Sequence, residues 1–440
     1  MVLVYAEKIT PRLGYIARLI FTDILGAELS LTSNLSEFLQ SELPKLNYSF
    51  RKISNELFLE AHPFLFSTAL EAPVFETGKC GDETFIFTTS GESCLPFDPL
   101  AASFFLVSRL EEYLSGQRDQ HGRYPAGESI LHRLKLLGRP VVNRWAWLLV
   151  DKISQKYPGL IFRRPRMQYL STIDVDNAWA YRHKGFFRAF AASLKGLLKG
   201  EGAVNRERFQ VLTGQMADPY DTYTYLQQIF SGNEAQVIFF FLVGDYARFD
   251  RSISWKNRAF RQLVQSTSGT YQTGLHPSYR SSAEEGNRQL MREKLRLQTI
   301  AEVAVTRSRQ HYLRLQLPQT YRKLLAAGIA EDYSMGYADA AGFRAGICTP
   351  FFFYDLENDR PTNLLIYPFQ VMDVTLRDYL HLTPQEARQK IEQLMNEVKA
   401  VGGMFVSIWH NESLSDSGPW KGWREVFELM NRLGFQYSHE

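Results

Sequence analysis

Beyond about residue 160, short apolar runs alternate with helical segments, and this alternation restricts the chain to an α/β architecture. Runs such as Val237–Val243 are typical of strands that are buried on both faces of a parallel sheet. About seven such strand and helix units predict either a barrel or a doubly wound sheet. The candidate strands are Gln168–Asp174, Val237–Val243, Tyr271–His276, Gln310–Leu315, Ile329–Tyr333, Leu364–Tyr367 and Met404–Trp409.

Two of the intervening helices have clear sequence signals. The segment Ala283–Ala304 carries apolar residues at helical spacing, which predicts an amphipathic helix. A second helix is expected to begin after Thr383, which forms a capping box with Glu386 and precedes a proline at the first helical position. Gly402 is expected to end this helix directly before the last strand.

Residues 1–160 have a different pattern, in which short strands mix with amphipathic helices such as Phe104–Leu114. The stretch Arg118–Ser129 is polar and contains Gly and Pro, which predicts a loop. We therefore predict a smaller N-terminal α+β domain over residues 1–160, with no assigned role, and a β/α domain over residues 161–440.

Charge and cysteine content exclude several classes of protein. Fifty Lys and Arg against 47 Asp and Glu leave a net charge of +3, so no strong cationic field for nucleic acid is predicted. Cys80, Cys94 and Cys348 have no C-x-x-C spacing, which argues against a disulfide framework and favours a reducing compartment, the cytoplasm. Charged residues follow the apolar run Val2–Ala6, so no export signal is expected, and no run is long enough to span a bilayer.

Carboxylate and imidazole side chains fall at the ends of the candidate strands. Asp174 and Asp176 end the first strand, His276 ends the third and His410 follows the last. His311 is the exception, because it is placed at the start of its predicted strand. In parallel α/β folds the carboxyl ends of the strands surround one site, so the strand-end residues are expected to lie close together.

These residue types suit metal-assisted acid and base chemistry. Carboxylates two positions apart on an extended chain point to the same side, which suits a metal ligand beside a general base. A neutral imidazole at His276 can bind zinc, and His410 can act as a general acid near neutral pH. Arg309 could orient a carboxylate and Tyr312 could supply a donor. Each residue also has a purely structural interpretation, as a helix cap, a packed loop residue or a strand-edge residue.

In this order, the segments between about residues 165 and 415 resemble the polysaccharide deacetylase family of carbohydrate esterases, whose domain is an incomplete β/α barrel. Thr172–Asp176 is similar to the T-F-D-D motif of that family, although spaced differently. His276 matches the first histidine of H-[ST]-x-x-H, Arg309–Tyr312 resembles R-x-x-Y, and His410 falls where the family has L-x-H. The resemblance implies an incomplete barrel of about seven strands.

The resemblance also implies a reaction, the metal-assisted hydrolysis of a non-peptide C–N bond in an N-acetylated sugar or polysaccharide. It assigns Asp174 as the base, held by Arg309, and His410 as the acid. It assigns Asp176 and His276 as ligands of a divalent metal such as Zn²⁺. Aromatic residues near the motifs, Tyr312 and Trp409, are candidates for lining the sugar-binding groove.

One position departs from the family pattern. Arg280 stands where the family has its second metal-binding histidine, and His311 is the alternative third ligand. Two other readings therefore remain open: a degenerate, non-catalytic carbohydrate-binding or scaffolding protein on the same barrel, and a metal-independent amidohydrolase.

Overall fold

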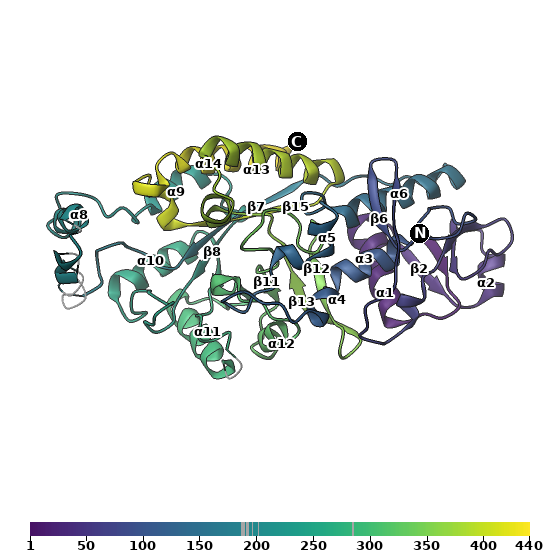
Figure 1. Ribbon diagram of the computed structural model, residues 1–440, viewed down its shortest axis with the longest axis horizontal. Helices are drawn as coiled ribbons and strands as arrows, with labels where there is room; N and C mark the ends of the chain where they lie inside the picture. Colours follow the sequence, from purple (N-terminus) through teal and green to yellow (C-terminus); the bar gives the residue numbers. More distant parts are fainter. Residues whose placement is uncertain (186–189, 191–192, 196, 201, 284–285) are drawn as a thin grey trace.

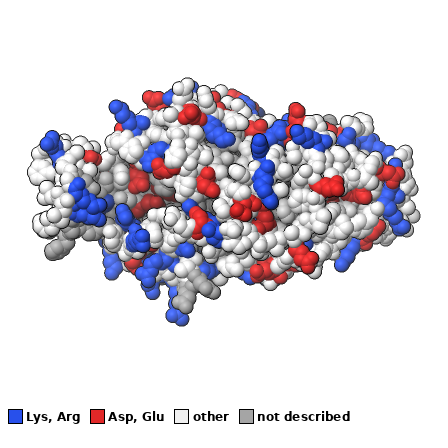
Figure 2. Space-filling view, in the orientation of Figure 1, with Lys and Arg blue, Asp and Glu red and all other residues white. Residues whose placement is uncertain are grey.

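The computed structural model describes residues 1–185, 190, 193–195, 197–200, 202–283 and 286–440 and has a mixed α/β architecture. The N-terminal elements lie at one end of the molecule and α8 lies at the other (Figure 1). Basic and acidic side chains are interspersed over the face shown in Figure 2. Among the described helices, none is both long and apolar enough to cross a bilayer.

The larger sheet has nine strands in the order β12-β13-β11-β10-β9-β8-β7-β15-β14. Neighbouring strands are parallel except β12 and β13, which are antiparallel. The ladder of described strands has two ends and does not close on itself, and it contains nine strands where about seven were expected. The incomplete barrel stays a prediction. The bounds are β7 Gln168–Val175, β8 Val237–Phe241, β9 Gln272–Leu275, β10 Arg307–Ser308, β11 Glu331–Asp332, β12 Phe351–Asp355, β13 Arg360–Ile366, β14 Val371–Met372 and β15 Met404–His410.

Strand β7 lies inside this sheet between β8 and β15, and its register positions the candidate site. Asp174 pairs with His410 of β15 on one side and with Phe240 of β8 on the other. Nearly every residue of β7 is buried, as expected for a parallel strand that is covered on both faces. The strand ends that carry polar residues are therefore fixed next to one another.

A second, smaller sheet lies in the N-terminal part, where four parallel strands follow the order β2-β1-β3-β4. Its strands are β1 Val2–Tyr5, β2 Leu29–Thr32, β3 Lys45–Ser49 and β4 Leu57–Glu60. A separate antiparallel pair consists of β5 Thr77–Cys80 and β6 Glu83–Ile86. One hydrophobic cluster contains buried side chains of both parts, from Val2 to Phe435. The two parts are therefore packed together through a continuous core.

Helices cover both sheets, and α13 and α14 lie along β7 and β15 in Figure 1. The helices of the N-terminal part are α1 Pro11–Arg18, α2 Leu35–Gln40, α3 Pro99–Val107, α4 Leu110–Leu114, α5 Ile130–Arg133 and α6 Val141–Lys156. The α-helices that the structure describes in the remaining chain are α8 Gly202–Leu212, α9 Tyr223–Phe230, α10 Arg258–Ser268, α11 Asn287–Ala301, α12 Gln319–Ala326, α13 Pro384–Val401 and α14 Trp423–His439.

The start of α13 is capped as the sequence predicts. The Glu386 amide donates to the Thr383 hydroxyl, and the Thr383 amide donates to the Glu386 carboxylate. Gly402 ends the helix with a φ of 68°. Helix α11 falls within the predicted segment Ala283–Ala304, of which residues 284 and 285 lie outside the described residues.

The predicted strand Gln310–Leu315 is wrong. The strand in this region is β10, three residues earlier, and His311–Leu313 forms a short 3-10 helix instead. Tyr312 and Leu313 have φ values of 58° and 53°, a left-handed conformation that cannot continue a strand. His311 therefore follows the carboxyl end of its strand and does not stand at the start of one.

The predicted helix Phe104–Leu114 is interrupted and forms two helices, α3 and α4. The break lies at Arg109, whose φ is 57°. Its guanidinium is fully buried and donates to Glu112 and to the carbonyl oxygen of Leu106, which fixes the chain in this conformation.

A buried ion cluster joins α4 to the segment that follows β11. Glu112 accepts from Arg109 Nε at 2.7 Å and from Arg344 Nη2 at 2.6 Å, and all three side chains are at most 2% exposed. Burial raises the pKa of Glu112, but the two guanidinium groups outweigh this effect and hold the pKa at about 2. Glu112 is therefore ionised and neutralises charge across the packed N-terminal and C-terminal parts.

We expect Glu112→Gln to lower the free energy of unfolding by about 3 kcal/mol at pH 7, because buried Arg344 loses the carboxylate it pairs with and Arg109 keeps only Glu111. The folded pKa of about 2 lies below the ordinary value of 4.5, so the stabilisation is present above pH 4.5 and is lost as pH falls towards 2. Urea unfolding at several pH values measures the difference between wild type and variant.

The matched control is Glu128→Gln, at an exposed position of the same part of the chain. It should change the free energy of unfolding by less than about 0.5 kcal/mol. A Glu112→Gln effect that stays constant from pH 7 to pH 3 would contradict the role of the ionised carboxylate.

Candidate metal centre and active site

A cavity of about 220 Å³ opens at the carboxyl ends of the strands. It receives side chains from β7, from the segments after β9, β10, β14 and β15, and from the N-terminal part. Its lining residues are Arg123, Asp174, Asp176, His276, Gln310, His311, Tyr312, Leu313, Met372, Val374, Tyr379, His410 and Glu412. Most of the residues singled out from the sequence therefore meet in one place.

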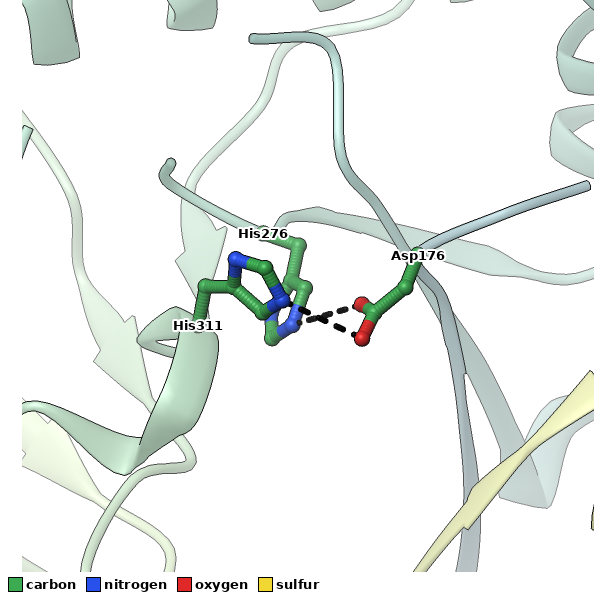
Figure 3. Close-up of side chains that lie close together, drawn as sticks. All are labelled: Asp176, His276 and His311. Atoms are coloured by element: carbon green, nitrogen blue, oxygen red, sulfur yellow. Dashed lines mark hydrogen bonds and ion pairs between the residues drawn. The ribbon is translucent and has the colours of Figure 1, made fainter. Parts of the chain in front are cut away.

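Asp176, His276 and His311 converge within this cavity (Figure 3). Nε2 of His276 lies 3.1 Å from Oδ1 of Asp176, and Nε2 of His311 lies 3.2 Å from Oδ2. One ligand atom from each residue lies within 4.8 Å of the others. Oδ1 of Asp176 is buried and accepts no hydrogen bond from any described residue, so it has free capacity for a cation.

The Nδ1 atom of each histidine ring contacts a fixed oxygen atom on the side away from Asp176. Nδ1 of His276 lies 2.6 Å from the carbonyl oxygen of Arg309, which can only accept, so this nitrogen carries the hydrogen. Nδ1 of His311 lies 3.0 Å from Oδ1 of Asp250. Metal-binding histidines in proteins make this type of second contact, which directs the other ring nitrogen towards the metal.

The pKa values of Asp176 and His311 are shifted in opposite directions. Burial raises the pKa of Asp176, but His311 and His276 outweigh it and hold the pKa well below its ordinary value. Burial lowers the pKa of His311, but Asp176 and Asp250 outweigh it and raise the pKa to about 9. At neutral pH and without a metal, a proton on His311 therefore balances the carboxylates, and a divalent cation could take over this task.

Asp174 lies beside this cluster and is held by Arg309. Arg309 Nη1 donates to Oδ1 of Asp174 at 2.9 Å and to the hydroxyl of Thr172 at 2.6 Å. Arg309 Nε donates to the carbonyl oxygen of Tyr333 at 3.1 Å, so the fully buried guanidinium is fixed on two sides. Oδ2 of Asp174 lies 3.8 Å from Nε2 of His276, on the side of the cluster formed by Asp176, His276 and His311.

His410 faces the cluster from the neighbouring strand. Its Nδ1 lies 2.9 Å from Oδ1 of Asp373, its amide donates to Oδ2, and its Nε2 lies 3.9 Å from Oδ2 of Asp176. Burial lowers the pKa of His410, but Asp373 outweighs it and raises the pKa well above its ordinary value. The contact with Asp373 therefore favours the imidazolium form of His410, whose Nε2 is directed towards Asp176.

One expectation about a site residue is corrected. Trp409 does not line the cavity: it is fully buried and its ring lies 5.5 Å from that of Phe427 of α14. Neighbouring side chains of a strand point to opposite faces, so His410 and Trp409 cannot both face the cavity. Arg280 is exposed and does not occupy a ligand position, whereas His311 completes the cluster.

Several further residues belong to the site, and their roles were not predicted from the sequence. Tyr379 and Glu412 line the cavity, and Asp373 and Asp250 hold histidines. Burial raises the pKa of Glu412 to about 7, against the lowering effect of His410. Glu412 lies two residues beyond the last strand-end histidine, so the strand-end pattern could have indicated it. Arg123 could not be found in this way, because it lies in the N-terminal loop.

A family model described as "Family of unknown function (DUF7033)" matches residues 2–158. No curated protein matches the chain. One similar solved structure, from Mycobacterium smegmatis, is provisionally described as a polysaccharide deacetylase. The alignment covers 63% of this chain and 91% of that protein, with 15% sequence identity and a TM-score of 0.40. A polysaccharide deacetylase from Bacillus cereus matches 63% and 89%, with 11% identity and a TM-score of 0.31.

We expect Asp373→Asn to lower the pKa of His410, because the main charge that stabilises the imidazolium is removed. An NMR pH titration of protein with labelled histidines measures the change, and the signal is assigned with His410→Gln. Asp378→Asn serves as control, since Asp378 is partly exposed and pairs with Arg377. An unchanged His410 titration in Asp373→Asn would show that Asp373 does not set this pKa.

Proposed function

We propose that this protein is a metal-assisted hydrolase that removes the acetyl group from an N-acetylated sugar or glycan. The observation that carries the proposal is the cluster Asp176, His276 and His311, which adjoins Asp174 and His410 in the same cavity. The order of the sequence motifs supports the choice of an N-acetyl amide.

The donor set fits a divalent metal. Two imidazole nitrogens and one carboxylate oxygen are ligands that zinc accepts, and three protein ligands leave a position open, as in catalytic zinc sites. The buried Oδ1 of Asp176 has no hydrogen bond from a described residue and so has a lone pair to give. When bound, such a metal supplies a Lewis acid that polarises a carbonyl and lowers the pKa of water.

The flanking residues supply the proton transfers. Asp174 accepts a proton from the water molecule whose oxygen bonds to the acyl carbon, and Arg309 keeps Asp174 oriented for this step. His410 donates a proton to the amide nitrogen as the C–N bond breaks, which releases acetate and the amine. Asp373 stabilises the imidazolium that makes this donation. Leu313, Met372 and Val374 give the cavity an apolar wall that suits an acyl methyl group.

We expect wild-type protein to bind about one equivalent of zinc and His311→Ala to bind it at least about 100-fold more weakly, since a ligand is lost. Calorimetric titration of metal-free protein and elemental analysis measure the two quantities. Arg280→Ala is the control and should bind zinc as the wild type does, because Arg280 is exposed. Less than about a tenth of an equivalent in the wild type would exclude the metal mechanism and favour a metal-free reading.

We expect Asp174→Asn to lower the rate of acetate release from an N-acetylated oligosaccharide by about 100-fold to 10,000-fold, because the base is lost. Its zinc content should not change. Asp245→Asn, at an acid in the segment after β8 that is largely exposed and pairs with Arg296, should keep the wild-type rate. An unchanged rate in Asp174→Asn would remove this residue from its role as base.

A further inference from the structure

The N-terminal part of the chain contributes directly to the cavity. Arg123, in the loop Arg118–Ser129, is the lining residue that comes from residues 1–160. Its side chain is only 10% exposed, and it lies in the wall with Tyr379 and Tyr312. Nothing in the proposed proton transfers uses this residue, so its place in the cavity needs another explanation.

The loop is docked on the segment that follows β10. Arg123 Nη1 donates to the carbonyl oxygen of Tyr312 at 3.1 Å. In return, Arg314 Nε donates to the carbonyl oxygen of His121 at 2.8 Å, and the rings of His121 and Tyr312 lie 4.9 Å apart. Gly122, with a φ of 77°, permits the tight turn between these contacts. The guanidinium is therefore held at a defined position.

The guanidinium has donors to spare. Besides the Tyr312 contact, Nε donates to Oδ2 of Asp119 at 2.6 Å and Nη2 donates to the hydroxyl of Tyr379 at 2.9 Å. An arginine side chain has five N–H donors, so these three bonds leave two. Nη1 and Nη2 each keep one N–H, at a residue that lines the cavity.

The charges around Arg123 indicate what these donors bind. Asp119 already neutralises the guanidinium at a distance of 2.6 Å. No net positive charge is therefore left at Arg123 to select an anion, whereas an uncharged oxygen acceptor needs only the two remaining N–H groups. Hydroxyl and carbonyl oxygens of a neutral sugar are acceptors of this kind.

We propose that Arg123 is a substrate-binding residue that donates hydrogen bonds to an uncharged oxygen of the sugar beside the metal cluster. This inference rests on the proposed function and extends it, because it gives the N-terminal part a role in substrate recognition. The active site is then built from both parts of the chain, and residues 161–440 alone lack one of its walls.

The test compares wild type, Arg123→Ala, Arg123→Lys and the control Arg133→Ala, an exposed arginine of the same part. Each zinc-loaded protein is titrated calorimetrically with the N-acetylglucosamine trisaccharide, and kcat and KM for acetate release are measured. Arg123→Lys keeps the positive charge opposite Asp119 but loses the forked donor group. Zinc affinity and thermal unfolding are measured on the same samples.

We expect the Arg123 variants to bind the trisaccharide about 10-fold more weakly with a raised KM, and Arg133→Ala to match the wild type. Zinc affinity should stay within about 3-fold of wild type, below the loss expected when a metal ligand is misplaced.

Unchanged trisaccharide affinity in both folded variants would overturn the role of Arg123 and leave the proposed function standing. A 10-fold loss of zinc affinity would overturn it too, because Arg123 would then act by positioning His311. Absence of binding and hydrolysis by the wild type would overturn both proposals.

Discussion

The site depends on the fixed direction of two imidazole rings. A neutral histidine can present either nitrogen, and its ring can turn, so a metal ligand needs a partner on the opposite side of the ring. For His276 that partner is the backbone carbonyl of Arg309, and for His311 it is Asp250. Arg309 also holds Asp174 through its guanidinium. One buried residue therefore orients a proposed metal ligand and the proposed base together.

The strand-end pattern predicted much of this arrangement from the sequence. Parallel strands bring their carboxyl ends to one edge, so Asp174, Asp176, His276 and His410 could be grouped without coordinates. The pattern failed at His311, because apolar residues at 313 and 315 imitate strand alternation. The left-handed conformation of Tyr312 has no signal in the hydrophobic pattern. Because the chain leaves the strand before this point, His311 lies beyond the carboxyl end of β10.

Other features of the site could not be predicted because they depend on contacts between distant segments. Asp250 is separated by 61 positions from the His311 ring it supports, and Arg123 by 189 positions from the Tyr312 carbonyl it contacts. The wrong expectation for Trp409 has another cause. Strand alternation alone requires Trp409 to face away from its neighbour His410, so this error could have been avoided from the sequence. Periodicity predicts which face of a strand is polar, but partners across loops follow only from the packing.

The packing of the N-terminal part shows why a loop from one part of the chain can serve a site in the other. Buried charges tolerate few arrangements, because each must meet its partner without water. Glu112 meets both Arg109 and Arg344, and Arg109 also donates to Tyr337, so these groups restrict how the two parts can dock. The backbone of Glu112 in turn accepts a hydrogen bond from Arg118, at the start of the loop that carries Arg123. The ion cluster therefore fixes the position of this loop near the cavity. A purely apolar interface would restrict the position less, because apolar contacts are not directional.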